Sequence, residues 1–164
     1  MFAAFGALSL GDTDIVGALL NNFLNKLSND GHVAMRIGTK NQILRYLHLQ
    51  TSHGAHHSQD KGSNVTYDGN SLLLIIAEKY ESLTGITLNR EKLRLVAKWL
   101  VDQNDDGLLY EGPYASWEDS LKHRGARLYT NVCYYRAQLS QSRLFRDTEL
   151  AIKALRTKSG IQGW

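Results

Sequence analysis

The segment "SLLLIIAEKYESL", residues 71–83, constrains the fold of this chain more than any other stretch. Its first half is apolar around nearly the whole circumference of a helix, instead of along one stripe. Such a helix is stable in water only when other elements cover it on more than one side. We therefore predict a buried helix at residues 71–83, with further helices packed around it.

Amphipathic helices are indicated on both sides of this segment. Apolar residues recur at helical spacing over residues 15–27, and Asp12 or Thr13 is a suitable N-cap. A second helical pattern covers residues 93–101, and Asn89 is its expected N-cap. Both segments therefore have an apolar face that can cover the buried helix.

The remaining parts of the chain are less regular. Residues 130–139 and 147–155 indicate two further helices, whereas helical periodicity fails between residues 28 and 70. There "HVAMRIG", residues 32–38, suits a short extended piece, and the polar, glycine-rich residues 50–70 suit a long loop. Loops of this length within a compact domain are usually functional or disordered.

The chain is predicted to be all-α, with about six helices in antiparallel pairs joined by long loops. Its 164 residues, 43% of them hydrophobic, suffice for one domain with a core and are too few for two. The buried helix needs partners on several faces, the chain opens in an apolar stretch, and it stops abruptly at "GIQGW". We expect residues 1–164 to be part of a larger helical array.

Charge and cysteine content argue against several functional classes. The net charge is +3 with the two signs interspersed, so we expect no nucleic-acid partner. No apolar run reaches the roughly 18 residues of a spanning helix and no signal peptide is recognised, so we expect no membrane partner. Cys133 is the only cysteine, which excludes an internal disulfide and favours a reducing, cytoplasmic location. Its helical, aromatic surroundings predict a buried structural thiol.

Two stretches have the composition of metal sites. Asp102, Asn104, Asp106 and Gly107 match the first positions of a calcium loop, but Pro113 stands where the bidentate glutamate is needed. We therefore predict that a helix ends there in a polar turn.

The second stretch contains His53, His56 and His57, followed by Asp60, a set that could hold zinc. Glycine and serine surround it, and nothing there enforces a coordination geometry. We expect a solvated or substrate-facing loop, and we predict neither a metal nor an organic cofactor for this chain.

The carboxylates after Trp117 are candidates for the general acid of a glycosidase. Glycoside cleavage needs one carboxyl to protonate the leaving oxygen and a second to act on the opposite face of the sugar. A tryptophan beside Glu118 and Asp119 could raise a carboxyl pKa and stack on a sugar ring. Alternatively, both acids simply favour the positive end of a helix dipole. The spacing of the residues leaves both interpretations open.

Three blocks follow one another in the chain: "FAAFGALSLGDTDIVGALLNNFLNKLSNDGHVAMRIG", "VTYDGNSLLLIIAEKYESLTG" and "DQNDDGLLYEG…SWEDSLKHRG…YTNVCYYRAQL". Together they cover most of residues 2–139. In this order and spacing they resemble the (α/α)6-barrel glycosidases, in particular the amylo-alpha-1,6-glucosidase domain of glycogen debranching enzymes. The resemblance implies an incomplete toroid of helical hairpins, so that residues 1–164 form a single partial catalytic domain of about half a barrel.

The same resemblance implies a glycoside hydrolase that acts on α-linked glucosides with inversion and needs no cofactor. Asp119 would be the general acid. The implied substrate-binding residues are Trp117, Glu118, Tyr67, Asp68, Arg124 and Asn131. An oligosaccharide or polysaccharide would be the substrate, and the remainder of the barrel or a second copy would cover the exposed apolar helix faces.

This sequence departs from the family pattern at three places. Tyr129 stands where relatives usually carry an acid, and Asn70 stands where many have aspartate. The general base of the family lies in the second half of the barrel, so it falls outside this chain. A non-catalytic carbohydrate-binding domain and a helical-repeat interaction domain are therefore the alternative functions.

Overall fold

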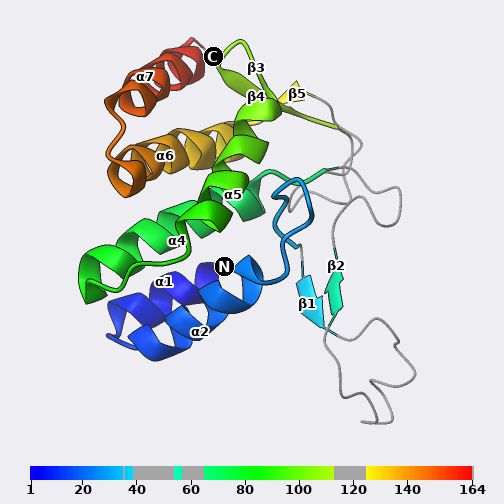
Figure 1. Cartoon of the computed structure of the whole chain (residues 1–164). Helices are drawn as coiled ribbons and strands as arrows, with labels where there is room; N and C mark the ends of the chain where they lie inside the picture. The colour runs from blue at the N-terminus through cyan, green and yellow to red at the C-terminus, as the bar shows by residue number, and fades with distance from the viewer. Residues whose placement is uncertain (35, 39–53, 57–64, 113–124, 164) are drawn as a thin grey trace.

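The computed structural model describes residues 1–34, 36–38, 54–56, 65–112 and 125–163 of the chain, and this part is mostly helical (Figure 1). The all-α prediction is therefore confirmed at the level of fold class. The helices are α1 (Phe2–Ser9), α2 (Thr13–Leu24), α4 (Asp68–Thr84), α5 (Arg90–Asp102), α6 (Leu128–Phe145) and α7 (Thr148–Gln162), and the strands are β1 (Arg36–Gly38), β2 (Gly54–His56), β3 (Asn104–Asp105), β4 (Leu108–Glu111) and β5 (Gly125–Ala126).

The helices form three hairpins that lie one upon another, α1 with α2, α4 with α5, and α6 with α7 (Figure 1). Helix α4 is central, since it contacts α1, α2, α5 and α6. The short strands pair as β1–β2 and as β3–β4–β5. They lie at the end of the stack where α4 and α6 begin (Figure 1).

The burial of α4 confirms the prediction made for its apolar sequence. Leu73, Leu74, Ile76 and Ala77 have no exposed surface, although they point to different sides of the helix. Burying a leucine or isoleucine side chain contributes about 1.5–3 kcal/mol, so this helix organises the core. Its buried residues are Asn70, Ser71, Leu72, Leu73, Leu74, Ile75, Ile76, Ala77 and Tyr80.

One polar residue in the first turn of α4 connects three parts of the fold. Asn70 is fully buried, and its Oδ1 accepts the Val33 N–H at 2.9 Å. Its Nδ2 donates to the carbonyl oxygens of Gly31, at 2.9 Å, and Val96, at 3.2 Å. Gly31 has a φ of +95°, and a Cβ there would lie 2.3 Å from the Leu95 carbonyl oxygen. The loop before β1 can therefore pass close to α5 only because position 31 is glycine.

The calcium-like pattern forms a β-hairpin turn. Asp105 pairs with Leu108, which leaves Asp106 and Gly107 as a two-residue loop with φ values of 49° and 89°. Positive φ at both positions is the requirement of a type I′ turn, for which Asp-Gly is a preferred sequence. The Asn104 Oδ1 accepts the Gly107 N–H at 3.2 Å. The predicted polar turn is thus confirmed, while the strands that flank it were not anticipated.

The helix boundaries agree with most of the local signals. Asn89 caps α5, since its side chain accepts the Lys92 N–H at 3.0 Å. Asp12 is the N-cap residue of α2, but its side chain makes no capping hydrogen bond. The segments predicted at 130–139 and 147–155 are parts of the longer helices α6 and α7.

The extended piece predicted at residues 32–38 is confirmed where β1 lies. His53, His57 and Asp60 of the possible zinc set lie outside the described residues. Among the residues that are described, no group of three or more His, Cys, Asp or Glu side chains could hold a metal ion.

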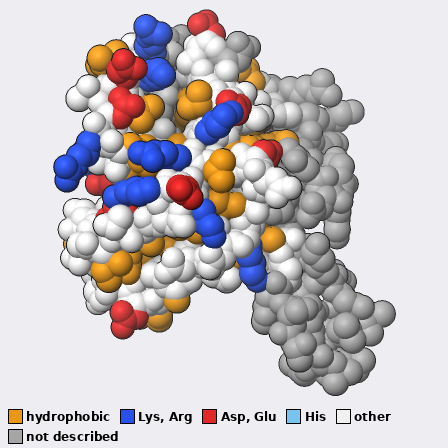
Figure 2. All heavy atoms as spheres, viewed as in Figure 1, with side chains coloured by type: hydrophobic (Ala, Val, Ile, Leu, Met, Phe, Trp, Pro, Cys, Tyr) orange, Lys and Arg blue, Asp and Glu red, His pale blue; other side chains and the backbone are white. Residues whose placement is uncertain are grey.

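The described helices and surface show how charge and hydrophobicity are distributed. None of these helices combines the length and the apolarity needed to cross a membrane. On the face drawn in Figure 2, the described Lys and Arg side chains lie interspersed with acidic and apolar ones.

The contacts of Asn70 predict that its replacement by aspartate is severely destabilising. The carboxylate in Asn70→Asp would be buried against the carbonyl oxygens of Gly31 and Val96, which at present accept from the amide. We expect the free energy of unfolding, measured by urea denaturation at neutral pH, to fall by about 3 kcal/mol or more. The matched control is Asn89→Asp, which should change it by less than about 0.5 kcal/mol because both residues are good N-caps. Equal effects of the two changes would contradict the role given to Asn70.

Candidate functional site

The predicted site residues divide into two groups. Tyr67 and Asp68 lie at the start of α4, and Asn131 lies in the first turn of α6. These two helix starts are at the same end of the stack (Figure 1). The other predicted residues lie outside the described part of the chain: Trp117, Glu118, Asp119 and Arg124.

The chain on either side of residues 113–124 is held at this end by strand pairing. Glu111 in β4 lies opposite Gly125 in β5, and Tyr110 lies opposite Ala126. The segment predicted to carry the catalytic acid therefore departs from and returns to two adjacent strands. Because β5 directly precedes α6, both anchor points are beside the start of that helix.

A buried polar contact connects β4 to the start of α6. Thr130, which is fully buried, donates its hydroxyl to the Glu111 carboxylate, which is itself 6% exposed. Burial and the negative charge of Glu111 raise the pKa of Tyr67. Glu111 therefore connects β4 to α6 by a hydrogen bond, and its charge acts on Tyr67, just before α4.

Asn131 holds the backbone of β4 in place. Its Oδ1 accepts the Leu109 N–H at 2.8 Å, and its Nδ2 donates to the Leu109 carbonyl oxygen at 3.0 Å. The Nδ2 also donates to the Arg127 carbonyl oxygen at 3.0 Å. Both N–H donors of the amide are thus used within the fold. Asn131 is a positioning residue for β4, and any influence on a sugar passes through that strand.

Asp68 lies in a polar cluster with Tyr129 and Cys133. The Tyr129 hydroxyl donates to Asp68 Oδ2 at 3.5 Å, and the Phe2 ring lies 6.5 Å from the Tyr129 ring, centroid to centroid. Burial raises the pKa of Asp68, although the Gly69 N–H and the Tyr129 hydroxyl oppose this. Tyr129, the departure from the family pattern, is therefore a neighbour of a predicted site carboxyl.

The same surroundings keep the other two groups of the cluster protonated. Burial raises the pKa of Tyr129, and the neighbouring Cys133 and Asp68 side chains raise it further. Burial also raises the pKa of the Cys133 thiol, which is partly buried. A thiol with a raised pKa is a weak nucleophile, whereas a carboxyl that keeps its proton to higher pH is suited to donate it. Asp68 is thus the group of this cluster whose raised pKa suits proton donation.

An aromatic stack behind Tyr67 was not found by sequence reasoning. The His32 and Trp99 rings are nearly parallel, 6° apart, with centroids at 4.3 Å, and the Tyr67 ring is 5.7 Å from Trp99. The Trp99 Nε1 donates to Asp30 Oδ2 at 3.2 Å. No periodic pattern could identify this stack, because His32 and Tyr67 come from non-helical segments. The stack fixes the position of Tyr67 at the start of α4.

Comparisons of the chain with protein-family models, curated proteins and solved structures find no significant match. The family resemblance of the three sequence blocks therefore stays a prediction.

The raised pKa of Asp68 predicts a pH-dependent cost to stability. Because the pKa is higher in the folded than in the unfolded chain, the folded state is penalised when the carboxyl ionises. Asp68→Asn should therefore increase the free energy of unfolding at neutral pH. The gain should disappear as the pH falls below the ordinary value of 3.8, where the carboxyl is protonated in both states.

Urea denaturation at several pH values measures this effect. The control is Asp106→Asn at the exposed hairpin turn, where asparagine also tolerates a positive φ. This control should change stability little at any of these pH values. A gain in Asp68→Asn that does not depend on pH would show that the carboxyl charge is not its cause.

Proposed function

We propose that these residues form part of an inverting glycoside hydrolase of the (α/α)6-barrel type, acting on α-linked glucosides. One observation supports it most. The acidic segment is residues 113–124. The paired strand residues on either side of it, Glu111 and Gly125, lie at the same end of the helical stack as Tyr67 and Asp68 (Figure 1). The resemblance assigns catalysis and sugar binding to those same parts of the chain.

In this proposal Asp119 protonates the glycosidic oxygen, and Trp117 forms the wall that raises its pKa and stacks on the sugar. A carboxylate from outside this chain activates water on the opposite face, with the two carboxyl groups about 6.5–9.5 Å apart. Tyr67 and Asp68 face the sugar from the start of α4. Neither a metal nor an organic cofactor takes part.

The proposed barrel needs three further hairpins in addition to the three that are described. Several exposed apolar side chains would be covered by such neighbours, and their exposed fractions are 88% for Leu10, 64% for Phe2, 59% for Ile15, 59% for Ile152 and 57% for Leu155. Exposed apolar patches commonly mark association surfaces. The rest of the barrel, or a second copy of the chain, is the proposed partner. The single cysteine is the reason for proposing a cytoplasmic location.

Replacing the proposed acid tests the mechanism. In the full-length gene product, Asp119→Asn should lower the rate of hydrolysis of a branched α-glucan by about 100-fold or more, as expected when a general acid is lost. Inversion predicts that the first glucose released is the β-anomer, which NMR detects. Asp106→Asn serves as the control and should keep the wild-type rate.

Glu118→Gln distinguishes the roles of the two neighbouring carboxyl groups, Glu118 and Asp119. If the rate of hydrolysis falls only slightly in this variant but strongly in Asp119→Asn, the general acid is Asp119. Hydrolysis by Asp119→Asn at near the wild-type rate would disprove the assignment.

The stacking of hairpins also favours a second candidate, a helical-repeat or carbohydrate-binding domain without catalysis. Open arrays of helical hairpins stack in the same manner and present binding surfaces. Glycan binding without turnover in the full-length protein would support a binding domain. Absence of both glycan binding and turnover would favour a helical-repeat interaction domain.

The exposed apolar side chains predict that the isolated chain associates. Light scattering should give a mass well above the 18.4 kDa of one chain. The double change Ile152→Glu with Leu155→Glu, on one face of α7, should reduce this mass. The control is Asn22→Glu with Thr87→Glu, which adds the same charge at exposed polar positions and should leave association unchanged. A wild-type chain that is monomeric would contradict the half-barrel proposal.

A further inference from the structure

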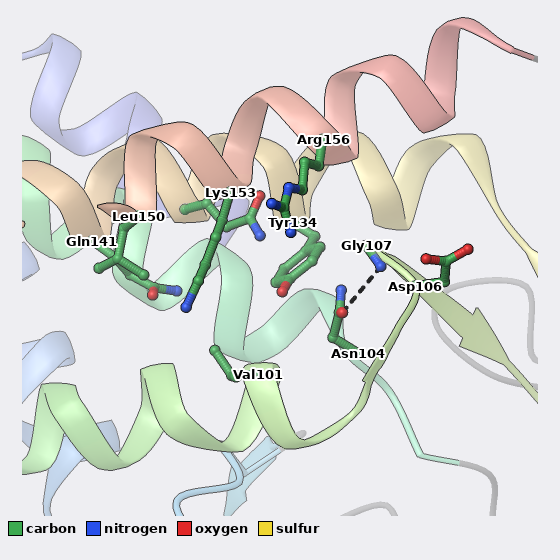
Figure 3. A pocket seen from close by; sticks show the side chains of 10 residues that line it. Val101, Asn104, Asp106, Gly107, Tyr134, Gln141, Leu150, Lys153 and Arg156 are labelled. Carbon is green, nitrogen blue, oxygen red and sulfur yellow. Dashed lines mark hydrogen bonds between the residues drawn. The ribbon is translucent and has the colours of Figure 1, made fainter. Parts of the chain in front are cut away.

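A cavity of about 340 Å³ lies between α5, α6, α7 and the β3–β4 turn (Figure 3). Its volume is in the range of small-molecule sites, roughly 300–1,000 Å³. None of the residues that line it belongs to the cluster around Asp68. The lining residues are Val101, Asn104, Asp106, Gly107, Tyr134, Gln138, Gln141, Leu150, Lys153 and Arg156.

The floor of the cavity comes from one face of α6. Tyr134, Gln138 and Gln141 follow one another at intervals of four and three residues, and all are at most 5% exposed. Burial raises the pKa of Tyr134, and the neighbouring Gln138 and Asn104 side chains oppose this. Gln141 differs from them, since its Nε2 is buried and has no hydrogen-bond partner among the described residues. A buried donor left without an acceptor is costly, and its retention calls for an explanation.

The α7 side of the cavity is positively charged. Lys153 and Arg156 lie three residues apart, and both extend from α7 toward the α6 side chains (Figure 3). Neither makes an ion pair with any other residue that the structure describes. Asp106, in the hairpin turn, is the acidic residue of the lining. The cationic groups and the unpartnered amide donor are therefore complementary to a negatively charged acceptor.

The two walls of the cavity are joined by a direct contact. The Thr157 hydroxyl of α7 lies 2.8 Å from the Gly107 carbonyl oxygen and 3.0 Å from Gln138 Oε1. Thr157 is fully buried, so this contact holds the hairpin turn against α7. A site whose walls are fixed before binding loses less conformational entropy when the ligand enters.

We propose that this cavity binds the oxyanion of a small metabolite, a carboxylate or a phosphate group. Arg156 and Lys153 pair with the anion, and Gln141 Nε2 donates to it from the floor. Arginine matches both oxyanions because its planar guanidinium donates two parallel hydrogen bonds, while lysine acts as a point charge. This site is independent of the proposed sugar chemistry, so either proposal can fail without the other.

Equilibrium dialysis of the whole chain against inorganic phosphate, and separately against succinate, tests the proposal. We expect saturable binding of one anion per chain, and the tighter of the two probes identifies which oxyanion the site prefers. Lys153→Gln and Arg156→Gln should each weaken binding about tenfold, as loss of one charge-assisted hydrogen bond implies. Absence of saturable binding for both probes would overturn the proposal.

Lys158→Gln is the matched control, because this exposed lysine lies on α7 outside the cavity lining. It removes the same charge and should leave binding unchanged. The chain is basic, with a pI near 9.0, so general attraction of anions has to be separated from a built site. Equal weakening by Lys158→Gln and Lys153→Gln would mean an adventitious ion only, and would overturn the proposal.

Gln141→Leu tests the buried amide. The change removes the donor to the anion but also removes an unpartnered polar group, so binding should weaken while the thermal midpoint without ligand stays equal or rises. A lower midpoint together with unchanged binding would show that the amide serves the fold, and would contradict the assigned role.

Discussion

The burial of the first half of α4 on almost every side is the constraint on which the rest of the structure depends. A helix with apolar residues around its circumference needs neighbours on several faces, and α1, α2, α5 and α6 provide them. Asn70 supplies the polar counterpart in the first turn of the same helix. Its amide satisfies the backbone of the preceding loop and of α5 at a place that water cannot reach.

The same packing determines the chemistry at the start of α4. The carboxyl of Asp68, which follows the core residue Tyr67 in the chain, is partly buried, and this burial raises its pKa. On the neighbouring side, Asn131 and Thr130 of α6 hold β4 by backbone and side-chain hydrogen bonds. The acidic segment, residues 113–124, thus departs from a strand that hydrogen bonds hold at the same end of the stack as a carboxyl with a raised pKa (Figure 1).

The polar groups of the cavity between α5 and α7 are arranged differently from those at the starts of α4 and α6. At Asp68 the polar groups of the described chain bond to one another, and burial sets their proton affinity. In the cavity, Gln141 and the two cations of α7 lack partners among the described residues. The first arrangement suits acid–base chemistry on a substrate, and the second suits the binding of an anion from solution.

Local signals in the sequence determined the buried helix, the amphipathic helix capped by Asn89 and the polar turn at Gly107, because periodicity, capping and turn chemistry act over a few residues. The tertiary structure alone decided that Tyr129 meets Asp68, 61 positions away in the chain. It also decided that Asn70 and Asn131 bond to distant backbone, and that Gln141 lines the same cavity as the two cations of α7. Such contacts depend on how the hairpins stack, and no spacing within a single segment encodes that.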